Sequence, residues 1–186
     1  MRLHRLALTL LVVIAMLMTG VAASAEFRVE QLSARPVEGT YLMDANIDYQ
    51  FSDTVIEALH NGVPLTLEVH VQLREKGSWI WENDLLDLRL RYRIRYLVLS
   101  STYQVEDLQS DVQQTFFTQR SAFEALGEIK DFPLIAEDRL SPGESYRLSL
   151  RASLDIEALP LPLRPTAYLT SSWKLSSKWR EWPLQR

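Results

Sequence analysis

The chain contains no cysteine and lacks the short motifs on which many enzymes depend. Disulfide bonds are therefore excluded, and stability has to come from the core alone. Two histidines, His60 and His70, follow the first 25 residues, and we expect both to be ordinary surface side chains. There is no Gly-x-Ser-x-Gly motif, no His-Glu-x-x-His motif and no glycine-rich phosphate loop. We therefore predict that the protein is not an enzyme and has no catalytic residue, metal ligand or cofactor.

Basic residues are outnumbered by acidic ones. The chain has 20 lysines and arginines against 24 aspartates and glutamates, which gives a net charge of −4. Loss of the first 25 residues, which include Arg2 and Arg5, would leave 18 basic residues and a net charge of −6. Binding to nucleic acid requires a strongly basic domain, because the phosphates are negatively charged. We therefore exclude nucleic acid as a partner.

The N-terminus has the pattern of a secretory signal peptide. Arg2 and Arg5 precede an almost uninterrupted apolar run over residues 6–21. A permanent membrane anchor is the alternative interpretation, but about 16 apolar residues lie at the lower limit for crossing a bilayer. No cysteine follows the run, so lipid anchoring through a cysteine is excluded.

The predicted cleavage site follows directly. Ala23 and Ala25 supply the small residues that signal peptidase recognises, and cleavage would make Glu26 the new N-terminus. We expect residues 1–25 to be removed and residues 26–186 to form one domain without a transmembrane span. A domain of this size buries about 70% of the surface of its extended chain, which is enough for a stable core.

Apolar and polar residues alternate with a period of two over much of the remaining chain. The alternation is clearest over residues 65–73, 86–96 and 148–156, and it predicts strands with one buried and one solvated face. Weaker patterns predict further strands at residues 27–34, 40–51, 97–108, 112–117 and 130–135. Turn residues at 75–78 and 141–143 separate neighbouring strands and favour antiparallel pairing.

Two short helices are predicted between the strands. In the first, Asp53 is the expected N-cap and Asn61-Gly62 the end. In the second, residues 121–124 (Ser-Ala-Phe-Glu) have the form of a capping box, and Gly127 ends the helix. We expect both helices to cross between sheets.

These elements predict an all-β fold. Antiparallel strands with one apolar face cover that face by packing a second sheet about 10 Å away. We predict an antiparallel β-sandwich of the immunoglobulin-like type, with one or two short crossover helices and a preceding signal-peptide helix. A closed barrel is the alternative, and the unequal strand lengths argue against it.

A row of arginines is the most unusual local feature. Period-two geometry places them on one sheet face at steps of about 7 Å; they are Arg89, Arg91, Arg93 and Arg95. If Arg147 and Arg151 lie on a neighbouring strand, the result is a basic strip suited to phosphate or carboxylate groups. The alternative, which we favour, is a solvated face whose arginines pair with cross-strand acids such as Glu68 and Asp155.

Tryptophan is the second notable residue type, with five copies at Trp79, Trp81, Trp173, Trp179 and Trp182. Tryptophans are frequent in the core and at the centres of interfaces. We expect residues 173–179 to form a strand that packs in the core or at an edge. If exposed, Trp173, Trp179 and Trp182 are candidate binding residues. The preceding segment 159–165 contains three prolines, and we expect an extended connection there.

Four segments, residues 91–108, 121–129, 142–165 and 171–184, resemble the bacterial family described as domain of unknown function 4390. This resemblance implies a protein exported to the periplasm, or to the outer face of the inner membrane, of a Gram-negative bacterium. It also implies a gene often placed beside a membrane sensor kinase of the nitrogen-regulation type. It implies no catalytic residue.

Taken together, these features predict a non-catalytic binding protein whose partner is a protein or an anionic component of the envelope. One specific form of this role is an accessory to the sensor kinase. The alternative is an envelope hydrolase with two carboxylates about 5 to 9.5 Å apart in a cleft. The sequence leaves the oligomeric state open.

Overall fold

The computed structural model describes residues 26–76 and 85–185. The predicted leader with Ala23 and Ala25 lies outside the described residues. So do Trp79, Trp81 and the second half of the turn predicted at residues 75–78.

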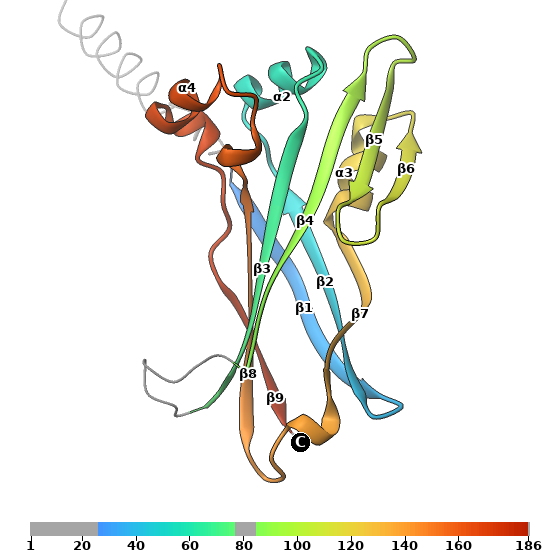
Figure 1. Cartoon of the computed structure of the whole chain (residues 1–186), viewed down its shortest axis with the longest axis vertical. Coiled ribbons are helices and arrows are strands. Elements are labelled where there is room, and N and C mark those ends of the chain that lie inside the picture. Colours follow the sequence, from blue (N-terminus) through green and yellow to red (C-terminus); the bar gives the residue numbers. More distant parts are fainter. Residues whose placement is uncertain (1–25, 77–84, 186) are drawn as a thin grey trace, which may run out of the picture.

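The described residues form two antiparallel sheets that pack as a sandwich (Figure 1). The smaller sheet has the order β1 (Phe27–Val37), β2 (Thr40–Tyr49), β7 (Glu128–Ala136). The larger has the order β6 (Val112–Phe116), β5 (Thr102–Asp107), β4 (Leu86–Leu97), β3 (Leu65–Glu75), β8 (Ser145–Leu154), β9 (Arg180–Gln185). The predicted all-β sandwich and its antiparallel pairing are confirmed.

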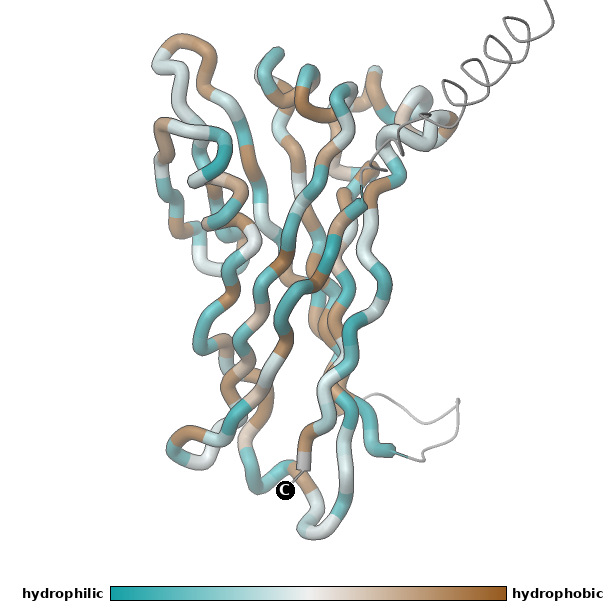
Figure 2. The backbone as a smooth tube through the Cα atoms, turned by 180° about the vertical axis from the view of Figure 1, so that it is seen from behind, coloured by the Kyte–Doolittle hydropathy of each residue, from teal (hydrophilic) through white to brown (hydrophobic). Residues whose placement is uncertain are grey.

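The core lies between the two sheets and is built from the alternating apolar positions. On β3, one of the two central strands of the larger sheet, Leu65, Val69 and Leu73 are completely buried. Val69 lies opposite Leu90 of β4 and Ala152 of β8, so that each row of the sheet sends a set of apolar side chains inward. Figure 2 shows hydrophobic and hydrophilic residues alternating along the strands. The period-two pattern of the sequence therefore specifies which face is buried.

Two helices cross between the sheets, as predicted. α2 (Asp53–His60) links β2 to β3, and α3 (Gln119–Gly127) links β6 to β7. The predicted N-caps were each wrong. Ser52 caps α2 by accepting a hydrogen bond from the Val55 amide, and Thr118 caps α3 in the same way. In each helix the hydroxyl oxygen accepts a hydrogen bond from the backbone amide three residues later, which is the geometry of an N-cap.

The close packing of α3 depends on its last residue. A Cβ atom added at Gly127 would lie 2.0 Å from the carbonyl oxygen of Ile47 on β2. Glycine is the residue that permits such a close approach of two backbones. Gly127 therefore fixes α3, and the β5–β6 hairpin that precedes it, against the smaller sheet.

The C-terminal region differs from the prediction. The proline-rich segment is not extended. The Leu163 amide donates a hydrogen bond to the Pro160 carbonyl oxygen and so forms a turn, and α4 (Arg164–Leu169) starts directly afterwards. Proline is favoured in the first turn of a helix, where Pro165 lies. Short 3-10 helices complete the chain: η1 (Glu137–Arg139), η2 (Ile156–Ala158) and η3 (Ser171–Trp173).

Residues 173–179 do not form the predicted strand. Trp173 belongs to η3, and Ser176 makes an isolated bridge to Ser153. The hydroxyl of Ser177 accepts the hydrogen bond of the Ala152 amide at 2.9 Å. A side chain thus replaces a backbone acceptor, and the regular strand β9 begins only at Arg180. The turn predicted at residues 141–143 is confirmed, with Gly143 at φ +82°.

Candidate functional site

The outer face of the larger sheet carries the four candidate arginines. We call it the charged face; it consists of the outward side chains of β4, β3 and β8 together with Glu106 of β5 and Asp155 after β8. His70 of β3 lies opposite Arg89 on one side and Arg151 on the other. The two arginines of β8 are therefore separated from the arginine row by a whole strand, and the row and β8 do not form one directly adjacent basic strip.

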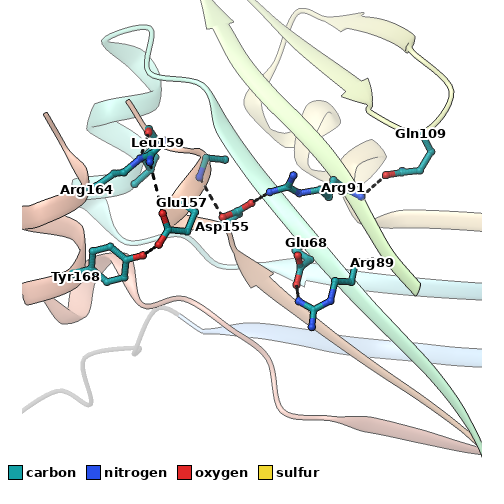
Figure 3. Close-up of polar contacts among 10 residues, drawn as sticks. Glu68, Arg89, Arg91, Gln109, Asp155, Glu157, Leu159, Arg164 and Tyr168 are labelled. Atoms are coloured by element: carbon teal, nitrogen blue, oxygen red, sulfur yellow. Dashed lines mark hydrogen bonds and ion pairs between the residues drawn. The ribbon is translucent and has the colours of Figure 1, made fainter. Parts of the chain in front are cut away.

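Each arginine of the row lies beside a carboxylate. The Arg89 Nη1 atom lies 3.0 Å from the Glu68 Oε1 atom, and Arg91 forms an ion pair with Asp155. Glu106 is shared: its Oε2 atom lies 3.2 Å from Arg93 and 3.8 Å from Arg95. Figure 3 shows the Arg89–Glu68 and Arg91–Asp155 pairs side by side. The cross-strand pairing expected under the favoured interpretation is present.

The two kinds of charge lie at different depths. The four arginine side chains are 38–60% exposed, whereas their three carboxylate partners are 10–20% exposed. The guanidinium groups therefore form the outermost layer, with the acids beneath them. Because a guanidinium has five N–H donors, an arginine that makes one ion pair still presents donors to a partner.

A second cluster lies farther down the charged face. The His70 Nε2 atom lies 2.9 Å from one oxygen of Asp87, and Gln72 donates to the other oxygen at 3.1 Å. The hydrogen bond from Gln72, aided by His70 and by the charge of Arg89, lowers the pKa of the Asp87 carboxyl. The ring of Trp179 packs 5.2 Å from the His70 ring and remains 40% exposed.

The rim of the charged face beside α4 contains a depression of about 430 Å³, lined by residues that include Glu68, Arg91, Asp155 and Tyr168. Asp155 also accepts a hydrogen bond from the Ala158 amide and so caps η2. Tyr168 donates to Glu157, which brings α4 onto the rim (Figure 3).

Glu157, Arg164 and Tyr168 were not predicted as site residues. They join the rim because α4 folds back, with the Arg164 Nε atom 2.8 Å from the Leu159 carbonyl oxygen. The signal that could have revealed this helix is Pro165, which is favoured in a first helical turn.

The three candidate tryptophans lie in different environments. Trp173 is 4% exposed and belongs to the core cluster. Trp179 lies on the charged face beside His70, while Trp182 of β9 lies opposite Leu148, whose side chain points into the core. Trp182 is 39% exposed because β9 is an edge strand. The structure therefore brings Trp179 to the arginine face but not Trp173 or Trp182.

Neither a metal site nor a membrane-spanning helix is found in the part of the chain that the structure describes. Residues 26–76 and 85–185 contain no group of three or more histidine, aspartate or glutamate side chains arranged to hold a metal ion. Among the same residues, no helix has both the length and the hydrophobicity needed to span a bilayer.

The family model described as Domain of unknown function (DUF4390) matches residues 24–183. The chain belongs to this family. The DUF4390 match begins just before β1 and reaches into β9, so it includes every strand that builds the charged face. No curated protein and no solved structure matches the chain significantly. Membership in DUF4390 carries no assigned activity.

Proposed function

We propose that this protein is an exported, non-catalytic binding protein whose partner docks on the charged face. The observation that supports the proposal is the arrangement of Arg89, Arg91, Arg93 and Arg95, exposed above recessed carboxylates. A rigid sheet holds these groups at fixed spacing, which reduces the ordering cost of binding.

The balance of charge favours a protein partner over a polyanion. Three carboxylates pair with four guanidinium groups, so the row retains little net positive charge. A polyanionic sugar or an anionic membrane selects surfaces with excess positive charge, whereas a protein surface can match alternating charges of both signs. Arginine and tryptophan are also enriched at the energetic centres of protein interfaces. Exposed Trp179 adds an apolar contact beside the row.

We propose further that the protein acts in the periplasm and that its scaffold is immunoglobulin-like. The signal-peptide pattern of residues 1–25 supports export to the periplasm, with cleavage before Glu26. The two packed antiparallel sheets are compatible with an immunoglobulin-like scaffold, a common basis for extracytoplasmic recognition. The gene neighbourhood implied by the family resemblance makes the outer domain of a membrane sensor kinase the first partner to test.

The experiment inverts one ion pair without removing it. In the double variant Arg89→Glu/Glu68→Arg the two charges exchange places, so the net charge and the pair remain while the outward pattern changes sign. Protein produced with its own leader is crosslinked in living cells, purified, and its adducts are identified by mass spectrometry. We expect a defined partner with the wild-type protein and at least a tenfold lower yield with the inverted pair.

A matched control uses the exposed pair of α3. Arg120 and Glu124 lie 2.8 Å apart on the helix surface, away from the charged face. The double variant Arg120→Glu/Glu124→Arg should give the wild-type yield. Equal yields from the two inversions would contradict docking on the charged face. Turnover of ester, peptide, glycoside or phosphoester substrates by the purified protein would contradict the non-catalytic part of the proposal.

A further inference from the structure

The described residues present four edge strands, and one of them differs from the other three. β1 and β7 are the edges of the smaller sheet, and β9 and β6 are those of the larger sheet. An edge strand exposes backbone N–H and C=O groups that can pair with another chain. Proteins usually protect such edges with charged residues, proline or a β-bulge.

Three of the edges carry these protections. β1 contains Pro36, β7 contains Pro133 and β9 contains Pro183, and each of these strands also has at least two charged residues. The pairing of β1 and of β7 with β2 is also interrupted by register shifts. These three edges are therefore poor templates for an added strand.

The fourth edge has none of these protections. β6 has the sequence Val-Gln-Gln-Thr-Phe, without charge or proline, and it pairs with β5 in unbroken register. Figure 1 shows β6 at the outer margin of the larger sheet. Val112 is 54% exposed, and Phe117, directly after the strand, is 85% exposed. An uncharged strand with exposed apolar side chains is suited to pairing.

The inner side of β6 is also incompletely covered. Val112 and Gln114 border a cleft of about 310 Å³, whose other walls include Tyr92, Ile129 and Phe132. The cleft lies between the β5–β6 hairpin and β7. In an ordinary sandwich, side chains of a facing sheet would occupy this space. A strand added beside β6 would place its inward side chains at the margin of the cleft.

We propose that β6 pairs antiparallel with β6 of a second copy of this chain, about a two-fold axis at Gln114. In this register Gln114 lies opposite Gln114 of the second copy, and Gln113 lies opposite Thr115. Val112 lies opposite Phe116 on the side of the cleft, and such pairs of β-branched and aromatic residues stabilise sheets. The two larger sheets become one continuous sheet.

A second copy fits β6 because the strand is complementary to itself. A two-fold interface brings identical residues together, so any charge near the axis would face its own copy. β6 has no such charge, although the whole chain has a net charge of −4. The interface is small, so the dimer is weak and reversible. β6 contains none of the four arginines of the charged face, and this dimer does not rest on the proposed function.

The test uses opposite charges at the two-fold position. Gln114→Lys places two lysines opposite each other, and Gln114→Glu places two glutamates there. Each variant alone should dimerise about fivefold more weakly than the wild type, because like charges directly opposite destabilise a strand pair. An equimolar mixture should dimerise at least as well as the wild type, since lysine then faces glutamate. Sedimentation velocity from about 10 µM to about 1 mM covers the range of weak complexes.

Gln31→Lys supplies the control, since Gln31 is an exposed glutamine on the protected edge β1. It should leave dimerisation unchanged, and recovery in the mixture shows that the Gln114 variants are folded. Wild-type protein that remains monomeric at about 1 mM would overturn the proposal, as would a dimer that Gln114→Lys does not weaken. Crosslinking of Gln114 to a different protein, with no second copy, would also overturn it.

Discussion

The charged face and the β6 edge belong to the same sheet, yet they leave different groups available for binding. On the charged face, the side chains are paired within the chain: Arg89 with Glu68, and Arg91 with Asp155. At the β6 edge, the side chains are uncharged and one row of backbone groups faces outward. A paired face keeps the protein soluble while presenting spare donors, whereas an uncharged edge favours the addition of a strand.

This difference follows from position within the sheet. β4 and β3 have neighbours on both sides, so cross-strand charges can pair with one another. β6 has a neighbour on one side only, and its inner face is held over a cleft by α3. Variants that alter only one of these two regions can therefore distinguish them.

The largest loss of stability is expected where α3 packs against β2. Gly127→Ala would force a methyl group against the Ile47 carbonyl, 2.0 Å away, so the helix or β2 must move. We expect a loss of about 4 kcal/mol or more in the free energy of unfolding. Urea denaturation followed by circular dichroism measures this loss.

Gly39→Ala is the matched control, because no atom lies within 4 Å of an added Cβ there. Gly39 has φ +80°, so alanine should cost about 1 kcal/mol from backbone strain alone. Equal losses at Gly127 and Gly39 would show that the close approach of α3 to β2 does not hold the β6 region.

Glu106, which pairs with two arginines, should contribute more to stability than Glu68, which pairs with one. Glu106→Gln removes the charge that Arg93 and Arg95 share, and we expect a loss of about 1–2 kcal/mol. Glu68→Gln affects the single pair with Arg89, the most exposed arginine of the row, and should cost less than about 1 kcal/mol. Thermal unfolding of the two variants ranks them, and a larger loss at Glu68 would contradict the assignment.

Tyr92, which lines the cleft under β6, should make the stability of the protein depend on pH in the alkaline range. Burial raises the pKa of Tyr92 to about 12, with a smaller contribution from the charge of Asp107. In the unfolded chain the phenol loses its proton near pH 10, so above that pH the folded state binds more protons. The free energy of unfolding should therefore fall as the pH rises from about 10 to about 12.

Tyr92→Phe should reduce that fall, because phenylalanine has no proton to lose. Urea titrations at pH 8 and pH 11 compare the two proteins. An identical loss of stability in both would show that Tyr92 is not buried against the cleft. Tyr49 is fully buried and its pKa is also raised, so part of the fall should remain in the variant.

The smallest effect is expected at Trp179. Trp179→Ala removes the ring that packs on His70, but the ring is 40% exposed, so we expect a loss of about 1 kcal/mol or less. The same variant should reduce the yield of the crosslinked partner more than it reduces stability. A large drop in melting temperature with an unchanged yield would assign Trp179 to the core rather than to the charged face.

The sequence predicted those features that depend on neighbouring residues in a strand. The alternation over residues 65–73 and 86–96 identified β3 and β4, and it put Glu68 and the arginines on one face. The pairing of Glu106 with Arg93 and Arg95 was not predicted. It depends on the register of β5 against β4, which is set by a turn in which Ser101 takes φ +52°.

Features that depend on the order of strands in the sheets could not be predicted from the sequence. Nothing local to residues 112–117 indicates that β6 is an edge, because edges are defined by the whole topology. A strand was predicted at residues 173–179 because Trp173, Leu175 and Trp179 fall on one face of an extended segment, but no regular strand forms there and β9 begins at Arg180. Trp173 is buried through η3 rather than through a strand.

Site-specific photocrosslinking in living cells tests the distinction between the two surfaces most directly. A photoreactive residue is placed at Ser149, which faces outward on β8 opposite Gln72, or at Gln114 on β6. We predict that Ser149 captures a different protein and that Gln114 captures a second copy of this chain. The same adduct from both positions, or no adduct from Ser149, would contradict the assignment of partner binding to the charged face.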